Sequence, residues 1–228
     1  MAELVLALDL PTAPDAERLL DRLEGVRWVK IGSVLFTGAG PAFVERLKHR
    51  GLAVFLDLKW HDIPNTVAGA VRQAAGLGVD MVTVHTLGGG AMLHAAGEAA
   101  GERLAVVGVS VLTSHTPQEW AAIVGRPAGD LAAEVTRLAD LARTAGIAGV
   151  VSSPLETARL RALLGPEALL VTPGIRAPGE AAGDQNRTAA APDAVRAGST
   201  HLVVGRPVLQ ASDPASAWSS LLASVAAR

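Results

Sequence analysis

The chain has 228 residues, 50% of them hydrophobic, and its 22 acidic and 20 basic side chains leave a formal net charge of -2. This composition is typical of a globular protein with a sizeable core, and it offers no broad cationic surface for a nucleic-acid backbone. The absence of cysteine excludes disulfides, thiolate metal sites and cysteine nucleophiles. No apolar run approaches the roughly 20 residues that cross a bilayer, and no signal peptide is evident. We therefore expect a cytoplasmic protein without nucleic-acid or membrane partners.

Short aliphatic runs recur along the chain and predict eight β-strands. In chain order they cover residues 4–8, 28–31, 53–58, 81–84, 104–111, 149–152, 169–171 and 201–204. The runs alternate little between polar and apolar side chains, which is typical of parallel strands buried on both faces. Stretches with helical spacing lie between them, several with a proline near the start and a glycine after the end.

This alternation predicts a single α/β domain over residues 1–228. Eight strands and about eight helices fit a (β/α)₈ TIM barrel better than a doubly wound sheet. Asp9-Leu10-Pro11 follows the first strand in place of a G-x-G-x-x-G turn, so we do not expect dinucleotide binding. The longest irregular stretch, residues 173–191, has the length of a functional loop.

Charged side chains stand at the ends of these apolar strands, where burial costs free energy unless the charges are paired or used. The carboxyl ends of barrel strands meet at one rim, so we expect a site there. The candidates in chain order are Asp9, Lys30, Asp57, Lys59, Asp62 and the pair Gly205-Arg206. A salt-bridge network that closes the rim is the alternative, but the set holds two of the chain's three lysines and favours a site.

Asp57 and Lys59 carry the most specific chemistry. Residues two apart on a regular strand share a face, so both side chains are expected to point the same way. A lysine between carboxylates stays protonated and becomes a fixed cation with a transferable proton. Such a group can stabilise a developing carbanion and then protonate it. Asp62 could complete this group, or it could act only near the N-cap of a helix that begins at Pro64.

An anion is expected to bind at the end of the last strands. Arg206 offers a planar fork that matches phosphate oxygens, and Gly205 lets the backbone approach. Arg176 could add charge or only close the long loop. We interpret Thr113, at the end of the fifth strand, as a hydrogen-bond donor to the edge of a ligand. The histidines show no metal-ligand spacing, and the serines lack the context of a nucleophile elbow.

The segment around these residues also resembles a known family. Residues 54–67 read Val-Phe-Leu-Asp-Leu-Lys-Trp-His-Asp-Ile-Pro-Asn-Thr-Val, and their D-x-K-x-x-D-I-P-x-T pattern closely resembles the signature of the orotidine 5′-phosphate decarboxylase family. Further matching motifs extend from residue 6 to residue 207. They are Leu6-Ala7-Leu8-Asp9, Val29-Lys30-Ile31-Gly32, Val111-Leu112-Thr113-Ser114, Pro173-Gly174-Ile175-Arg176, Gly183-Asp184-Gln185-Asn186-Arg187 and Val204-Gly205-Arg206-Pro207.

The resemblance implies a reaction of de novo pyrimidine biosynthesis, from orotidine 5′-monophosphate to UMP and carbon dioxide, without a metal or organic cofactor. Lys59 would protonate C6 of the pyrimidine. Asp57 would lie against the substrate carboxylate, where it favours departure through repulsion or organises the cationic site. Lys30 would bridge Asp57 and a ribose hydroxyl, and Asp9 would bind the ribose.

The resemblance also implies a homodimer with shared sites. Asp62, Ile63 and Thr66 would reach into the site of the neighbouring subunit. The remaining expected contacts are Thr113 at the pyrimidine edge, Gln185 between the closing loop and the substrate, and Arg206 at the phosphate, with Gly205 and Arg176 beside it.

Two alternatives stay open. Related sugar-phosphate lyases and decarboxylases share D-x-K-x-x-D on the same barrel, but they typically carry a metal-binding Glu where this chain has Lys30, and a lysine there opposes a divalent cation. A catalytically silent nucleotide-binding barrel would tolerate loss of the proton donor. The intact Lys59 and its flanking aspartates disfavour this second alternative.

Overall fold

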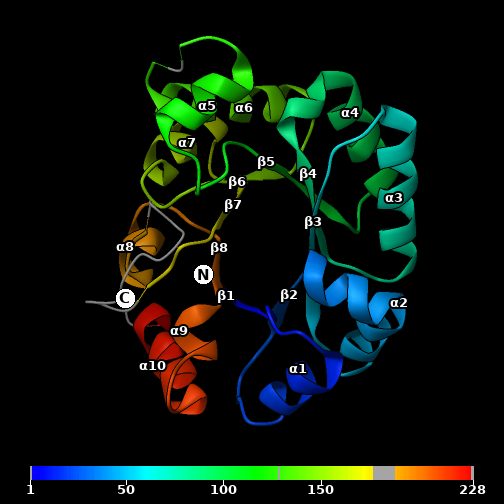
Figure 1. The fold of residues 1–228 in the computed structure, drawn as a ribbon, viewed down its shortest axis with the longest axis vertical. Helices are drawn as coiled ribbons and strands as arrows, with labels where there is room; N and C mark the ends of the chain where they lie inside the picture. The colour runs from blue at the N-terminus through cyan, green and yellow to red at the C-terminus, as the bar shows by residue number, and fades with distance from the viewer. Residues whose placement is uncertain (1, 128, 177–187, 227–228) are drawn as a thin grey trace.

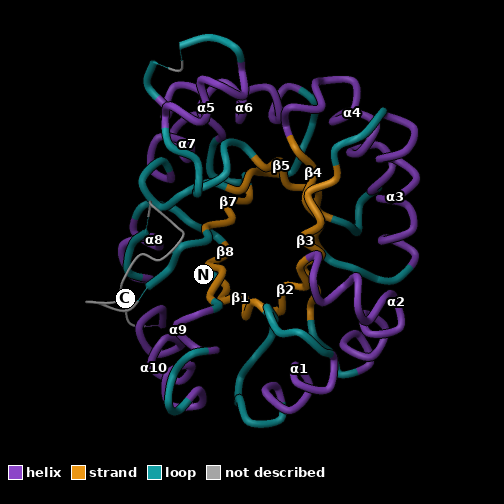
Figure 2. Tube along the Cα trace, viewed as in Figure 1, coloured by secondary structure: helices purple, strands orange, loops and turns teal. Residues whose placement is uncertain are grey.

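The computed structural model describes residues 2–127, 129–176 and 188–226. Eight parallel strands pair in sequence order, and β8 pairs with β1, so the sheet closes into a barrel, as predicted (Figure 2). The strands are β1 (Glu3–Ala7), β2 (Trp28–Gly32), β3 (Ala53–Trp60), β4 (Met81–His85), β5 (Ala105–Val109), β6 (Gly149–Val151), β7 (Leu169–Thr172) and β8 (His201–Val204).

Helices surround the barrel on its outside (Figure 1). They are α1 (Ala13–Leu20), α2 (Ser33–His49), α3 (Pro64–Gly76), the 3₁₀ turn η1 (Thr86–Gly88), α4 (Gly89–Ala100), α5 (Pro117–Val124), α6 (Leu131–Thr144), α7 (Thr157–Leu164), α8 (Ala191–Arg196), α9 (Arg206–Leu209) and α10 (Pro214–Ala226). The prediction of about eight helices was too low, because two helices follow β5 and two follow β8. Every helix of the described residues is too short or too polar to span a bilayer.

The two faces of each strand bury different apolar clusters. Val5, Phe55 and Val171 belong to a cluster that fills the barrel interior, whereas Leu6 and Leu56 belong to the larger cluster between strands and helices. Successive strand residues point to opposite faces, so the interior positions recur every second residue. This burial on both faces explains why the strand sequences alternate so little.

Several predicted strand ends were wrong by one to a few residues. β5 ends at Val109, where its pairing with both neighbours ends, because Val109 pairs with His85 of β4 and with Val151 of β6, the last residue of each strand. Thr113 therefore lies in the loop after β5 and not at the end of the strand. Asp9 likewise follows β1, which ends at Ala7, and Arg206 begins α9 after β8.

The amino end of the barrel is held by polar and aromatic contacts. The Arg161 guanidinium donates to the carbonyls of Gly198, Gly165 and Pro166 at 2.8, 2.6 and 3.0 Å. The ring of His201 meets the edge of Trp28, with 5.0 Å between ring centroids. Trp218 of α10 donates from Nε1 to the carbonyl of Glu24 at 3.0 Å.

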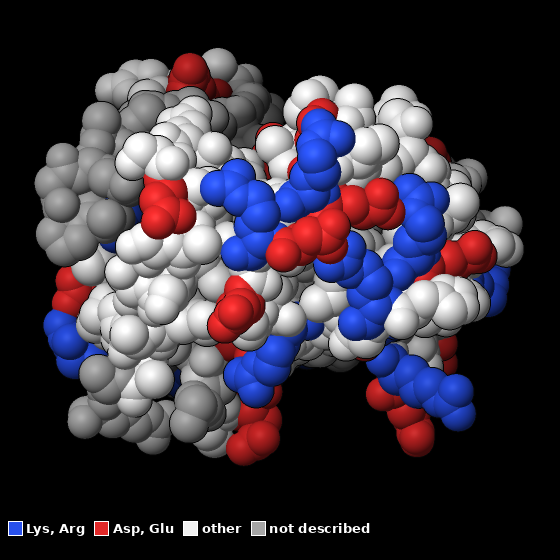
Figure 3. All heavy atoms as spheres, turned by 90° about the horizontal axis from the view of Figure 1, so that it is seen from below, with Lys and Arg blue, Asp and Glu red and all other residues white. Residues whose placement is uncertain are grey.

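The outer surface mixes charges of both signs. Two ion pairs join α2 to α1 at the outer surface. Arg46 pairs with Glu17 at 2.8 Å, and Arg50, the C-cap of α2, pairs with Asp21, the C-cap of α1, at 2.7 Å. Figure 3 shows acidic and basic side chains interleaved on one such face. This pattern agrees with the small net charge of -2.

Candidate active site

A cavity of about 520 Å³ opens at the carboxyl ends of the strands. Interior barrel residues form its apolar part, among them Ala7, Phe55 and Val203. Charged residues line the same cavity from different strands and loops, namely Asp9, Lys30, Asp57, Lys59, Arg176 and Arg206. An apolar base below a charged rim suits a ligand with a flat organic part and an anionic part.

The change from apolar to polar follows the two-residue period of the strands. Phe55 belongs to the interior cluster, and Asp57, two residues later on β3, lines the cavity. Trp28 and Lys30 repeat the same step on β2. The interior of the barrel therefore continues directly into the site, and Lys30 and Asp57 stand on strands instead of loops.

The charged residues form a chain of alternating sign. The Lys30 ammonium lies 2.9 Å from Oδ1 of Asp9 and 3.6 Å from Oδ2 of Asp57. The Lys59 ammonium lies 2.9 Å from Oδ1 of Asp57. The side chains of Lys30 and Asp57 are only 10% and 13% exposed, so water screens this contact little.

These contacts fix the ionisation of Asp57. Burial pushes the pKa of this carboxyl upward, but the positive charges of Lys30 and Lys59 push it down. Hydrogen bonds from Lys59 and Thr83 act in the same downward direction, and the resulting pKa lies below its usual value. Asp57 is therefore an anion at neutral pH, with a lysine side chain on each side.

The backbone at Lys59 departs from regular strand geometry. Its φ is 52°, the only positive φ of a non-glycine residue in the described part of the chain. The pairing of β3 with β4 shifts register between Leu56 and Trp60. The Lys59 amide N–H donates to Oγ1 of Thr83 at 2.8 Å. A left-handed residue at a bulge is strained and is often found at a functional site.

Arginines and a glycine close the cavity near β7 and β8. Arg176 is buried and donates from Nη1 to the carbonyl of Ile175 at 2.8 Å, and Arg206 is half-buried. A Cβ at Gly205 would lie in van der Waals contact with the rim, 3.4 Å from that of Ala7 and 3.6 Å from Oδ2 of Asp9. Two guanidinium groups in one cavity can bind an anion such as phosphate.

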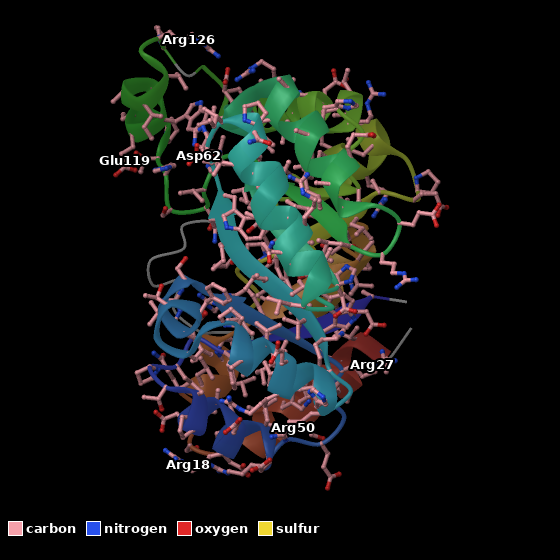
Figure 4. All side chains as sticks on the ribbon, turned by 90° about the vertical axis from the view of Figure 1, so that its right-hand side faces the viewer. Arg18, Arg27, Arg50, Asp62, Glu119 and Arg126 are labelled. Atoms are coloured by element: carbon pink, nitrogen blue, oxygen red, sulfur yellow. The ribbon has the colours of Figure 1, made fainter. Side chains whose placement is uncertain are left out.

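Other residues predicted for the site lie elsewhere. Asp62, Ile63 and Thr66 are exposed and do not line the cavity of their own chain. Figure 4 shows Asp62 on the loop after β3, at the same end of the molecule as Glu119 and opposite to Arg27. Asp62 accepts from the N–H of Ile63 at 2.6 Å, and Ile63, not Asp62, is the N-cap of α3. Thr113 lines the cavity, whereas Gln185 lies outside the described residues.

The sequence interpretation missed Thr83 and the apolar lining. Thr83 is fully buried and contacts both Asp57 and Lys59. Its position two residues after Met81, an interior residue, is the signal that could have identified it. Val109 and Val151 add apolar surface to the cavity. In the described ranges, no three His, Asp or Glu side chains are arranged to hold a metal ion.

Comparisons with known proteins agree with this architecture. The model of the orotidine 5'-phosphate decarboxylase / HUMPS family matches residues 2–221. A protein of Halorhodospira halophila named orotidine 5'-phosphate decarboxylase is 52% identical over 98% of this chain and 96% of its own length. A protein of the same name from Alkalilimnicola ehrlichii is 50% identical over 100% of this chain and 97% of its own.

A solved structure resembles the whole barrel as well. The crystal structure of orotidine 5'-phosphate decarboxylase from Lactobacillus acidophilus superposes with a TM-score of 0.88 and 34% sequence identity, and covers 100% of both chains. Because the family model and these relatives match nearly the entire chain, the protein belongs to the orotidine 5'-phosphate decarboxylase / HUMPS family.

Proposed function

We propose that this protein decarboxylates orotidine 5′-monophosphate to UMP and carbon dioxide in pyrimidine biosynthesis. The observation that carries the proposal is the contact of 2.9 Å between the Lys59 ammonium and the Asp57 carboxylate in the cavity. This pair combines a proton donor with a fixed anion, and the relatives that match nearly the whole chain bear the name of this activity.

Lys59 acts as the proton donor to C6 of the pyrimidine. The bond between C6 and the carboxylate breaks, its electron pair stays on C6, and carbon dioxide leaves. Lys59 then gives a proton to C6, and the neutral amine recovers a proton from water. Two ammonium groups already oriented by Asp57 stabilise the negative charge that develops on C6, without reorganisation at the moment of reaction.

Asp57 lies against the carboxylate of the substrate in this scheme. The repulsion between the two anions disappears when carbon dioxide leaves, or else Asp57 acts mainly by holding the two lysines in place. Lys30 bridges Asp57 and a ribose hydroxyl, and Asp9 binds the ribose. The distances of 2.9 and 3.6 Å from the Lys30 ammonium to these two carboxylates support this assignment.

The phosphate and the pyrimidine occupy opposite parts of the cavity. Arg206, Gly205 and Arg176 bind the phosphate, Thr113 meets the pyrimidine edge, and Gln185 connects the long loop to the substrate. Binding energy from the phosphate then helps to assemble and dry the site for a reaction at a distant atom.

The proposed reaction uses neither a metal nor an organic cofactor. Lys30 supports this point, because its ammonium lies in the cavity between two carboxylates that could otherwise attract a divalent cation. The metal-dependent sugar-phosphate reactions of related barrels are the alternative that the experiment below distinguishes.

We also propose a homodimer in the cytoplasm, with Asp62, Ile63 and Thr66 completing the site of the partner. Residues 61–66 are all exposed in the single chain, and Ile63 is 66% exposed. An exposed large apolar side chain beside a charged one, at the mouth of the barrel, supports a contact with a second subunit.

The first test is turnover of orotidine 5′-monophosphate, followed by ultraviolet absorbance in excess chelator. We expect turnover by the unaltered protein and a loss of about 100-fold or more in Lys59→Ala, because the proton donor is gone. Lys48→Ala is the matched control, since Lys48 pairs with Asp80 at 2.6 Å and does not line the cavity.

The other outcomes are equally informative. Turnover that requires added magnesium would move the protein to the sugar-phosphate branch. Binding of the nucleotide without turnover in either buffer would indicate a silent nucleotide-binding barrel. Equal activity of Lys59→Ala and Lys48→Ala would remove Lys59 from the proposed mechanism.

A further inference from the structure

We propose that Thr83 is a positioning residue, whose hydroxyl holds the Lys59 backbone and the Asp57 carboxylate in their reactive arrangement. The inference rests on the proposed function for its catalytic consequence. It rests on the geometry of β3 and β4 for the contact itself.

The contact replaces missing strand pairing. Leu56 pairs with Val82, and the next pair is Trp60 with Val84. Four steps along β3 thus correspond to two steps along β4, and residues 57–59 lie opposite Thr83 alone. A bulge of this kind leaves backbone groups without ladder partners. The Thr83 side chain supplies one, because its Oγ1 accepts from the Lys59 N–H at 2.8 Å.

The direction of the two hydrogen bonds of the Thr83 hydroxyl follows from which groups can donate a proton. A backbone N–H can only donate, so the Thr83 hydroxyl is the acceptor toward Lys59. Its single proton remains available for Oδ1 of Asp57, which lies 3.1 Å away. Thr83 is 0% exposed, so bulk water has no access to substitute for the hydroxyl. One oxygen atom therefore links the backbone of the proposed proton donor to its carboxylate partner.

This link also orients the two oxygens of Asp57. Oδ1 accepts from Thr83 and from the Lys59 ammonium, at 3.1 and 2.9 Å, while Oδ2 faces Lys30 at 3.6 Å. Without the hydroxyl, the carboxylate could rotate, and the left-handed Lys59 would lose the partner of its amide. The apolar cavity residues and the phosphate-binding side would not change.

The test compares Thr83→Val, which removes the hydroxyl at nearly constant volume, with Thr83→Ser, which keeps it. We expect Thr83→Val to lower kcat between about 10-fold and 100-fold, the loss that corresponds to one hydrogen bond to a charged group. KM and the affinity for UMP, measured by calorimetry, should stay within about threefold. Thr83→Ser should restore kcat to within about threefold of the unaltered protein.

Thr86→Val is the matched control. Thr86 is also a fully buried threonine next to β4, but its hydroxyl donates to the carbonyl of Val109 at 2.8 Å. Thr86→Val therefore removes a hydroxyl from the same region, and this hydroxyl contacts neither Asp57 nor Lys59. Thermal melting of each variant establishes that the barrel is folded before kinetics are compared.

A second readout does not depend on turnover. The carboxyl carbon of Asp57 can be titrated by NMR and assigned with Asp57→Asn. The charged groups that face it are Lys30 and Lys59, with Asp9 on the far side of Lys30. Loss of the hydrogen bond from Thr83 should raise the midpoint in Thr83→Val, and Thr86→Val should leave it unchanged.

The proposal is overturned if Thr83→Val keeps kcat within twofold, if Thr83→Ser fails to restore it, or if Thr86→Val loses as much. An unchanged Asp57 midpoint in Thr83→Val overturns it as well. If the unaltered protein does not turn over orotidine 5′-monophosphate, the proposed function fails, and the Asp57 titration alone decides the role of Thr83.

Discussion

His201 is a buried titratable side chain at the amino end of β8, and it does not line the cavity. It is 8% exposed, its Nδ1 lies 2.9 Å from Oγ1 of Thr200, and its ring packs on Trp28. Burial lowers the pKa of His201 from 6.5 to about 4. The native protein therefore holds this imidazole neutral, and the acid sensitivity of the fold should depend on it.

The sign of the effect follows from proton binding. Between pH 6.5 and about 4, the unfolded chain binds a proton at this position and the folded chain does not. The contribution of the neutral His201 to the free energy of unfolding is thus complete above pH 6.5 and is lost as the pH falls toward 4. We expect it to be up to about 3 kcal/mol. His201→Phe, which keeps an aromatic ring against Trp28, should flatten this part of the stability profile.

Chemical denaturation at several pH values between 4 and 7 would measure the slope. His94→Asn, at an exposed position, is the control and should leave the profile unchanged. An equally steep profile in His201→Phe would assign the acid sensitivity to other groups. His85 is one such group, because burial lowers its pKa to about 4, together with the charges of His61, Lys59 and His115.

Among the elements, β6 leaves no room for a side chain against β7 at Gly149. A Cβ built there would lie 2.0 Å from the carbonyl oxygen of Leu169 and 2.6 Å from its Cβ. Both obstacles belong to a neighbouring strand of the closed barrel and have no free direction in which to move. Only glycine fits at this position of the sheet.

Gly149→Ala should therefore lower the free energy of unfolding by about 3 kcal/mol or more. For a chain of this length, that corresponds to a decrease in Tm on the order of 6–12 °C, measurable by calorimetry. Gly76→Ala, at the end of α3 with open space around the new methyl group, is the comparison and should be neutral or slightly stabilising. Equal Tm values for the two variants would contradict the steric argument.

The sequence predicts the order and type of the elements better than their ends. Buried parallel strands are recognisable as short aliphatic runs, and all eight were predicted from them. The end of β5 was not predicted, because it coincides with the ends of its two partner strands, β4 and β6, which lie elsewhere in the sequence. The pair of helices after β5 was missed because only one helix per strand was expected from the fold.

At the scale of the whole molecule, the proposed dimer makes a prediction about mixed subunits. Lys59→Ala and Asp62→Ala should each be strongly impaired. In a hybrid dimer of the two, one site receives an intact Lys59 from one chain and an intact Asp62 from the other. Exchange at equal concentrations should thus restore about one quarter of the unaltered activity, because half of the dimers are hybrids with one intact site.

A mixture of Lys59→Ala with Asp57→Ala is the control. Both residues line the cavity of the same chain, so no hybrid contains an intact site. If the first mixture recovers no more activity than the control, Asp62 does not act across a subunit interface. Sedimentation of each protein would establish whether dimers are present at the assay concentration.

The site illustrates how far a sequence can be interpreted before the fold is known. Asp9, Lys30, Asp57 and Lys59 could be assigned to one cavity because parallel strands end at one rim. The role of Thr83 could not be predicted from the sequence, because its contact with Lys59 depends on a register shift between β3 and β4. The partner-facing role of Asp62 stays a prediction, because it depends on a second subunit.

The distribution of aromatic rings has a practical consequence. The chain contains four tryptophans and no tyrosine. Trp28 contacts His201, Trp60 ends β3 next to Lys59, Trp120 is buried in α5, and Trp218 anchors α10. Intrinsic fluorescence of this protein therefore comes from indoles alone, and single-tryptophan variants would give separate optical reporters for the amino end, the surroundings of Lys59 and the outer helical layer.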